Sequence, residues 1–146
     1  MDSANIKNTG LRGITIATTK ISDVNGALGK LIYRGYLVKD LAENTTFEEV
    51  IYLLLYERLP GIDELEEFTK KINSESDLHD GIIQAMKIMP KDSLPMDVLQ
   101  ACISLLSNYE EDVTSKSRDI VTEMAIRLIS KTSSIVATWQ RIRNDE

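Results

Sequence analysis

Apolar residues recur along most of the chain with the spacing of one face of an α-helix. The densest run begins after Thr45 and Thr46, each of which has a glutamate three residues on, so either can form a capping box. Pro60 ends the run, because proline lacks the amide proton that a continuing helix needs. We therefore predict a helix that is apolar on all sides and lies inside a larger structure. Its main face comprises Phe47, Val50, Ile51, Leu54 and Leu55, and Tyr52, Leu53 and Tyr56 make the other faces apolar.

The chain after Pro60 continues with the same periodicity, and charged residues lie outside the apolar stripes. The helix that ends the chain should be the longest, roughly 40 Å at about 1.5 Å per residue. A polar patch at 131–134 interrupts its stripe. The predicted helices span 62–73, about 79–89, from Pro95 to an acidic loop at 108–112, and about 117–143. Their stripes comprise Ile62, Leu65, Phe68 and Ile72; Ile82, Ile83, Met86 and Met89; Met96, Leu99, Cys102, Ile103 and Leu106; and Ile120, Met124, Leu128, Ile135, Trp139 and Ile142.

The first third of the chain has a different pattern. Residues 1–10 are small and polar, which is typical of a flexible arm. Over 14–33, β-branched and alternating residues flank Asn25-Gly26, a strong hairpin signal, so we predict a β-hairpin there. The glycines at 26 and 29 are interpreted as turn residues and not as a phosphate loop, because Leu31 stands where that loop needs serine or threonine.

Composition narrows the classes of protein that fit. A chain of 146 residues with no internal repeat and no linker is predicted to be one domain, 1–146. Its net charge of −6 argues against a nucleic-acid partner, and no apolar run predicts a membrane span or a signal peptide. One cysteine excludes an internal disulfide framework and a multi-cysteine metal site. We expect a cytoplasmic location.

Few residues stand out as candidates for chemistry. The single histidine, His79, is interpreted as a surface or helix-start residue, with a pH switch or ligand role as the alternative. Cys102 lies in an apolar stripe, which predicts a buried, inert thiol. Arg141 and Arg143 end the last helix, where cations suit the helix dipole, and anion contact is the alternative. The methionines Met86, Met89, Met96 and Met124 are interpreted as core residues.

Several ordered blocks resemble one enzyme family. Tyr33-Arg34-Gly35-Tyr36 is followed by the segments 39–44, 47–50, 52–56 and 59–60, and the whole series closely resembles the N-terminal region of citrate synthases and 2-methylcitrate synthases. The resemblance extends to 10–14, 89–92 and 95–99. It implies an all-α fold, a multi-helix portion of that family's large domain, with the β-hairpin at 14–33 and helices over 45–143. Arg34, inside the first block, is interpreted as bracing the chain turn, with substrate contact as the alternative.

The resemblance also implies a reaction: citrate synthases of the tricarboxylic acid cycle condense acetyl-CoA with oxaloacetate. In that family an aspartate removes a methyl proton, two histidines act on the enolate and on the oxaloacetate carbonyl, and arginines hold the carboxylates. This chain has one histidine, and it matches no catalytic motif of the family. We therefore assign no catalytic, cofactor-binding or metal-binding residue, expect no bound cofactor, and expect the chain alone to be inactive.

Three interpretations of the function follow from the resemblance. The first is the N-terminal part of a citrate synthase-type enzyme that lacks the catalytic half. The second is an inert stand-alone or regulatory dimerisation module derived from the same scaffold. The third is the equivalent portion of a 2-methylcitrate synthase, which uses propionyl-CoA. The last two predicted helices resemble ones that cross the family's dimer interface, so we expect a homodimer or assembly with the missing C-terminal half.

Overall fold

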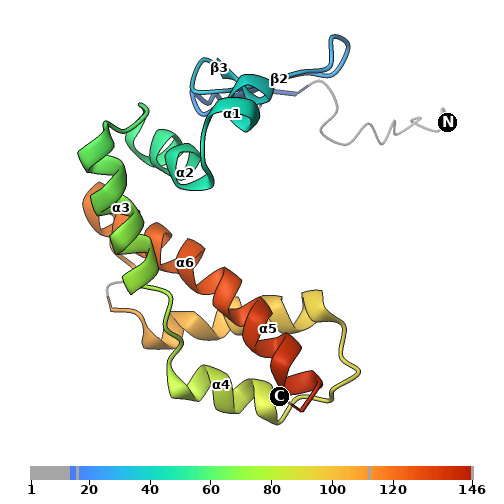
Figure 1. Cartoon of the computed structure of the whole chain (residues 1–146). Helices are drawn as coiled ribbons and strands as arrows, with labels where there is room; N and C mark the ends of the chain where they lie inside the picture. The colour runs from blue at the N-terminus through green and yellow to red at the C-terminus, as the bar shows by residue number, and fades with distance from the viewer. Residues whose placement is uncertain (1–13, 16, 112, 146) are drawn as a thin grey trace, which may run out of the picture. The chain divides into compact units, whose positions relative to one another are not determined.

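The computed structural model describes residues 14, 15, 17–111 and 113–145 (Figure 1). The arm predicted at 1–10 lies outside these residues. The chain divides into two compact units, Met1–Thr46 and Phe47–Glu146, so the boundary falls where the densest apolar run begins. The all-α class with a small β-element is confirmed. Among the described residues, no helix has the length and apolar character needed to cross a bilayer.

The first unit holds an antiparallel sheet of order β1-β2-β3, built from β1 (Ser22–Asn25), β2 (Lys30–Tyr33) and β3 (Tyr36–Leu37). The predicted hairpin is present, with Asn25 paired to Lys30, but its first strand lies at 22–25 and not at 14–21. The Asn25 side-chain oxygen accepts the Leu28 N–H at 3.1 Å, so the asparagine closes the loop from the strand end.

The second turn of this sheet and the helix after it were not predicted. Arg34 and Gly35 have φ of 47° and 93°, the pair of positive values that a type I′ hairpin turn requires, and this turn pairs Tyr33 with Tyr36. Helix α1 (Val38–Asn44) follows at once and buries Leu41. Helical structure therefore begins before the predicted residue 45. Thr45 ends α1, because its hydroxyl donates to the Leu41 carbonyl at 2.6 Å, so it is not the N-cap of the next helix.

The second unit confirms the predicted series of helices after residue 46. One boundary differs in its cause: α2 ends at Tyr56, where Glu57 takes a left-handed φ of 69°, and not at Pro60. A short 3₁₀ turn, η1, follows α5. The elements are α2 (Phe47–Tyr56), α3 (Ile62–Ser74), α4 (Asp80–Lys87), α5 (Pro95–Leu106), η1 (Ser107–Tyr109) and α6 (Arg118–Arg143).

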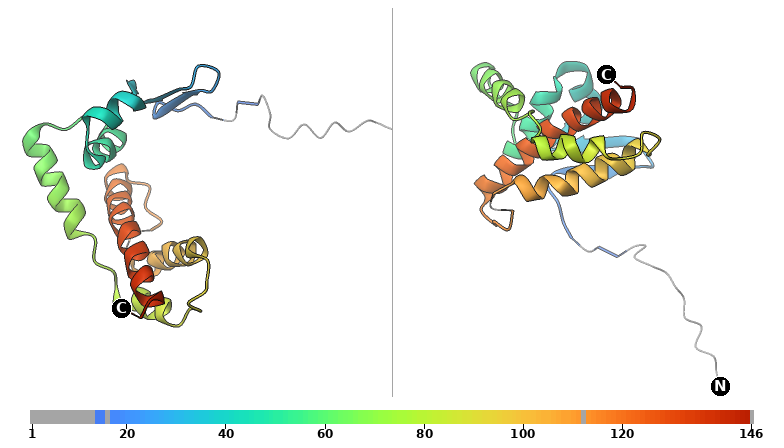
Figure 2. Two further views of the ribbon diagram at one scale, coloured as in Figure 1. Left: turned by 45° about the vertical axis from the view of Figure 1, so that its right-hand side comes forward. Right: turned by 90° about the horizontal axis from the view of Figure 1, so that it is seen from below.

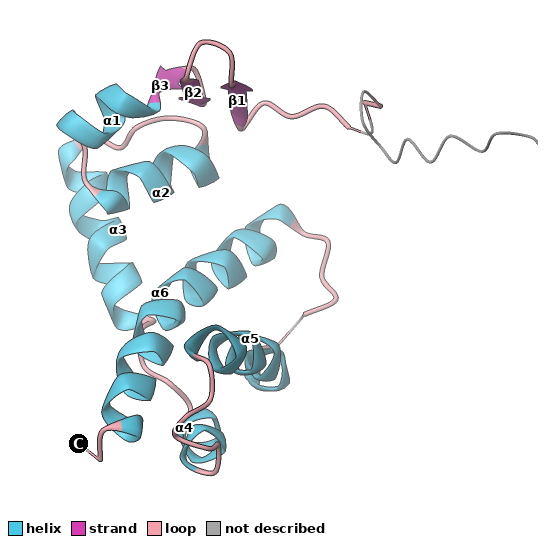
Figure 3. Ribbon diagram, turned by 90° about the vertical axis from the view of Figure 1, so that its right-hand side faces the viewer, coloured by secondary structure: helices cyan, strands magenta, loops and turns pink. Residues whose placement is uncertain are grey.

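Helix α6 is the common strut of this unit, and it packs against α3, α4 and α5 (Figures 2 and 3). Its N-terminal half brings Ile126 into a cluster with α2 and α3, made of Ile51, Tyr52 and Phe68. Its C-terminal half brings Ile135 and Trp139 into a second cluster with α4 and α5, made of Ile82, Met86, Val98, Cys102 and Leu106. One helix thus joins two separate cores.

The predicted stripe of α6 is partly wrong for that reason. Ile126 and Ile135 are nine residues apart, about half a turn around the helix at roughly 100° per residue, so the two halves bury opposite faces. Ile126 and Ser130 are buried although neither belongs to the predicted apolar stripe. Leu128 belongs to that stripe but is 42% exposed. Ser130 is tolerated inside because its hydroxyl donates to the Ile126 carbonyl at 2.8 Å.

Other helices show similar departures at single positions. Phe47 at the start of α2 is 69% exposed, so the other helices of this unit do not cover α2 on all sides, and its being enclosed in a larger structure stays a prediction. Met96 and Ile62 are exposed, and Val98 is buried in place of Met96. Both exposed residues lie in the first turn of their helices, beyond the reach of the cores.

Candidate functional site

His79, the single histidine, is the strongest candidate in the chain for acid–base chemistry. The structure places it at the start of a helix, as predicted. It is the N-cap of α4, and its Nδ1 accepts the Gly81 N–H at 3.0 Å. The imidazole stacks on the Tyr109 ring, with the centroids 4.0 Å apart and 25° between the planes. A Cβ on Gly81 would lie 2.0 Å from the Tyr109 hydroxyl, so any larger residue there would force the Tyr109 ring to move.

A pocket of about 520 Å³ surrounds this stack. Its two cations are already paired: the Arg127 Nε donates to Glu110 at 2.6 Å, and the Lys131 ammonium donates to the Glu75 carbonyl oxygen at 3.2 Å. The Arg127–Glu110 pair is well shielded, with side chains 26% and 17% exposed. The lining comprises Asp77, Leu78, His79, Leu106, Tyr109, Glu110, Glu111, Arg127 and Lys131.

The arrangement in this pocket supports structure better than catalysis. The histidine uses Nδ1 as the hydrogen-bond acceptor for the cap, so this nitrogen is engaged with the backbone of α4. Arg127 pairs with the Glu110 carboxylate, and Lys131 pairs with the Glu75 carbonyl and carboxylate. Neither cation therefore presents an unshared charge to a ligand. The His79–Tyr109 stack fastens the start of α4 to the end of η1.

Cys102 is where the sequence predicts it, in the core beneath α4 and α6. Burial raises the pKa of its thiol, which keeps it protonated and unreactive. Within 14, 15, 17–111 and 113–145, no three His, Cys, Asp or Glu residues gather in a way that would hold a metal ion. Arg141 and Arg143 lie in the last turn of α6, and Arg34 lies in the β2–β3 turn, where its backbone N–H donates to the Ile21 carbonyl at 2.9 Å.

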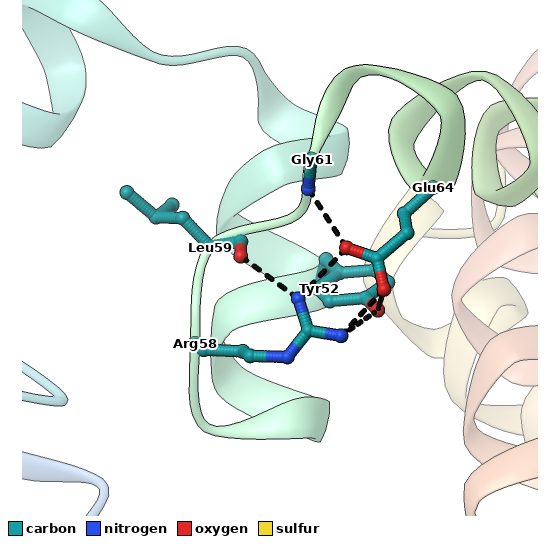
Figure 4. Close-up of polar contacts among 5 residues, drawn as sticks. All are labelled: Tyr52, Arg58, Leu59, Gly61 and Glu64. Carbon is teal, nitrogen blue, oxygen red and sulfur yellow. Dashed lines mark hydrogen bonds and ion pairs between the residues drawn. The ribbon is translucent and has the colours of Figure 1, made fainter.

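A polar cluster that sequence reasoning missed closes the α2–α3 connection (Figure 4). The Arg58 guanidinium grips the Glu64 carboxylate with both terminal nitrogens, at 2.7 and 2.5 Å. The same carboxylate accepts the Gly61 N–H at 2.8 Å and the Tyr52 hydroxyl at 3.2 Å. Arg58 and Glu64 are six residues apart on either side of Pro60, which is neither a helical nor a strand spacing. The sequence therefore offers no rule that predicts this contact.

The electrostatics of this cluster follow from its hydrogen bonds. The bond from Arg58, followed by that from the Gly61 N–H, lowers the pKa of Glu64 to about 2. The hydrogen bonds that Arg58 donates to Glu64 raise the pKa of the Arg58 guanidinium above its ordinary value. Burial and the bond to Glu64 raise the pKa of Tyr52. All of these groups remain in their ordinary charge state at neutral pH, so the cluster fixes a turn and offers no general acid or base.

These features define a largely helical protein with a small antiparallel sheet, and comparison with known proteins agrees with the fold. The family model described as "Citrate synthase, C-terminal domain" matches residues 10–146. The chain belongs to the citrate synthase family, as its sequence blocks predicted.

Curated relatives carry both names that the resemblance suggested. The citrate synthase of Haloferax volcanii is 36% identical, with the match covering 94% of this chain and 37% of the relative. The 2-methylcitrate synthase of Shewanella oneidensis is also 36% identical, with coverage of 99% and 38%. The chain therefore spans little more than a third of the length of these relatives.

Solved structures show the same partial coverage. The citrate synthase of Thermotoga maritima superposes with a TM-score of 0.80 at 33% identity, covering 94% of this chain and 35% of that one. The citrate synthase of Pyrobaculum aerophilum gives a TM-score of 0.84 at 31% identity, with coverage of 92% and 36%. The citrate synthase of Thermoplasma acidophilum, at 25% identity, was solved in a ternary complex with carboxymethyl coenzyme A and oxaloacetate.

Proposed function

We propose that this chain is the scaffold part of a citrate synthase-type enzyme, whose catalytic residues lie in the portion of the fold that the chain does not span. The observation that carries the proposal is the match of residues 10–146 to the family, together with coverage of little more than a third of the relatives. The family reaction, condensation of acetyl-CoA with oxaloacetate, is the activity to which the chain would contribute.

The chemistry of this condensation supports the division of labour. A carbon acid must lose a proton to a positioned base while a donor stabilises the enolate, and the family uses an aspartate and two histidines for these tasks. This sequence has a single histidine, and its Nδ1 is engaged in capping α4. What the chain supplies is rigid support: a long helix joining two cores, with turns fixed by the Arg58–Glu64 and His79–Tyr109 contacts.

A 2-methylcitrate synthase is the second candidate, favoured by the 36% identical relative from Shewanella oneidensis. The relative from Bacillus subtilis, 33% identical, is named as acting in both roles. The two reactions differ in the acyl group of the thioester, acetyl or propionyl. The same assay with the two thioesters separates them.

The partners follow from the same proposal. The chain would form a homodimer, or assemble with the C-terminal half of the fold that carries the catalytic residues, in the cytoplasm. Acetyl-CoA would be a substrate of the assembly and not a group held by this chain.

The experiment is complementation in vitro. The 146-residue chain is co-expressed with the remaining part of the Thermotoga maritima citrate synthase, in a host without its own citrate synthase. We expect the pair to release CoA from acetyl-CoA in the presence of oxaloacetate. Absence of CoA release from a pair that copurifies would overturn the proposal.

A further inference from the structure

One hydrogen bond at the start of α4 depends on a group that titrates. The His79 Nδ1 accepts the N–H of Gly81, the second residue of the helix, at 3.0 Å. The next amides of the first turn, those of Ile82 and Ile83, donate to the His79 backbone carbonyl at 2.9 and 3.4 Å. A carbonyl keeps its role as an acceptor at every ordinary pH, whereas a ring nitrogen accepts a hydrogen bond only in its unprotonated form. The Gly81 bond is therefore the one contact of this cap that responds to a proton.

Protonation of His79 would reverse the role of Nδ1. Both ring nitrogens of an imidazolium are donors, so the Nδ1–H would face the Gly81 N–H, another donor. A positive charge would also lie at the N-terminus of α4, where the helix dipole disfavours cations. Imidazole is the side chain that ordinarily changes charge between about pH 5 and 8, and His79 is exposed to solvent. The cap is therefore open to loss within that range.

The surroundings of His79 offer the imidazolium other contacts. Carboxylates lie in the loop before α4, in its first turn and after η1, and the two cations come from α6 and are paired with Glu110 and Glu75. The face of the Tyr109 ring, stacked 4.0 Å from the imidazole, also suits a cation. A charged ring therefore has a stable place away from the cap. The charged residues that line the pocket or adjoin the histidine are Asp77, Asp80, Glu110, Glu111, Arg127 and Lys131.

We propose that His79 is a pH-sensitive cap, which holds the first turn of α4 when the imidazole is neutral and releases that turn when the imidazole is protonated. The release is confined to the first turn, because Ile82 and Met86 are fully buried and hold the rest of the helix. It loosens the contact between α4 and η1 as well, because the Tyr109 ring packs on His79 and its hydroxyl packs on Gly81. The cap consists of contacts within this chain, so it does not depend on the proposed function.

The test follows the Gly81 amide by nuclear magnetic resonance in the full, isotope-labelled chain at about pH 5 and about pH 8. Hydrogen exchange is expressed as a protection factor, so that the intrinsic effect of pH on exchange cancels. The nitrogen shifts of the single imidazole report the protonation of Nδ1 in the same sample. His79→Asn is the matched variant, because asparagine is a good N-cap whose side-chain oxygen does not titrate. The Leu28 N–H, which donates to the Asn25 side-chain oxygen at 3.1 Å, is the internal control.

We expect the protection of Gly81 to be at least about threefold lower at the acidic pH, with the same midpoint as the protonation of Nδ1. Protection of Leu28 in the parent, and of Gly81 in His79→Asn, should change less than about 1.5-fold. Gly81 protection that ignores pH, or that follows it with another midpoint, overturns the proposal.

The same pH response in His79→Asn also overturns it, because the neighbouring carboxylates would then be the cause. If a thermal melt shows that His79→Asn does not fold, the agreement or disagreement of the two midpoints in the parent decides.

Discussion

His79 and Tyr109 lie thirty residues apart in the sequence and stack face to face, with ring centroids 4.0 Å apart. The stack joins the N-cap residue of α4 to the last residue of η1. Gly81, which has no Cβ, leaves room for the Tyr109 hydroxyl. The chain's only histidine thus serves to fix the path of the backbone. That role accounts for a histidine in a pocket whose cations are paired with groups of the same chain.

Gly81→Ala should destabilise the chain although alanine is the better helix former. The new Cβ would lie 2.0 Å from the Tyr109 hydroxyl, and displacing the ring breaks the stack on His79. We expect a loss of about 1–3 kcal/mol in the free energy of unfolding, measured by urea titration. Gly26→Ala is the control, because nothing lies within 4 Å of its Cβ position, and it should change stability by less than about 0.5 kcal/mol. An alanine at 81 that leaves stability unchanged or raised would contradict the packing.

Ile126→Ala and Leu128→Ala test the two-faced burial of α6. Ile126 has no exposed surface, whereas Leu128 is 42% exposed. Removing the buried side chain should cost about 2–5 kcal/mol, and removing the exposed one less than about 1 kcal/mol, in the same urea titrations. Equal losses would indicate that one continuous stripe of α6 is buried, as periodicity alone predicts.

Glu64→Gln should change the pH dependence of stability. The pKa of Glu64 is lowered from 4.5 to about 2 in the folded chain, so its ionised form stabilises the fold above about pH 4.5, and that contribution disappears as the pH falls toward 2. We expect the parent to be more stable than Glu64→Gln near neutral pH, with the difference shrinking over this acid range. Unfolding titrations at several pH values measure it. Glu67→Gln, on the exposed side of α3, is the control and should show a smaller pH-dependent difference.

The Cys102 thiol should resist modification in the folded chain. It is fully buried, and burial raises its pKa, so both access and the thiolate fraction are reduced. With a chromogenic disulfide reagent at neutral pH, we expect labelling at least about a hundredfold slower in buffer than in denaturing urea. Labelling at the same rate in both would show that α5 and α6 do not close over the thiol.

Much of the helical series is predictable because each boundary has a local chemical cause. Pro95 begins α5, and His79 sits where its helix was expected to start. The elements that escaped prediction are short or depend on distant partners: β3 exists only because Arg34 and Gly35 form a type I′ turn, and α1 buries a single leucine, Leu41. Periodicity also assumes one partner per helix. It fails for α6, which faces one core at Ile126 and another at Ile135.

The candidate site was predictable only in part. The sequence indicates that His79 lies at a helix start, but its partner Tyr109 follows another helix and an intervening loop, and no local rule brings the two rings together. The Arg58–Glu64 pair crosses a proline-containing connection, where neither helical nor strand spacing applies. The family membership was carried by ordered sequence blocks, and these lie on scaffold helices and turns.

In the proposed function, this chain contributes structure, and not catalytic groups, to a citrate synthase-type enzyme. The most direct measurement is the rate of CoA release from acetyl-CoA and oxaloacetate, for the purified chain alone and for the chain copurified with the remaining part of the Thermotoga maritima enzyme. We expect no release by the chain alone and release by the pair. We also expect the pair to keep its activity with His79→Asn, because asparagine is itself a good N-cap. Release of CoA by the chain alone, or its loss from a His79→Asn pair that still copurifies and melts like the parent, would contradict the structural role of this chain.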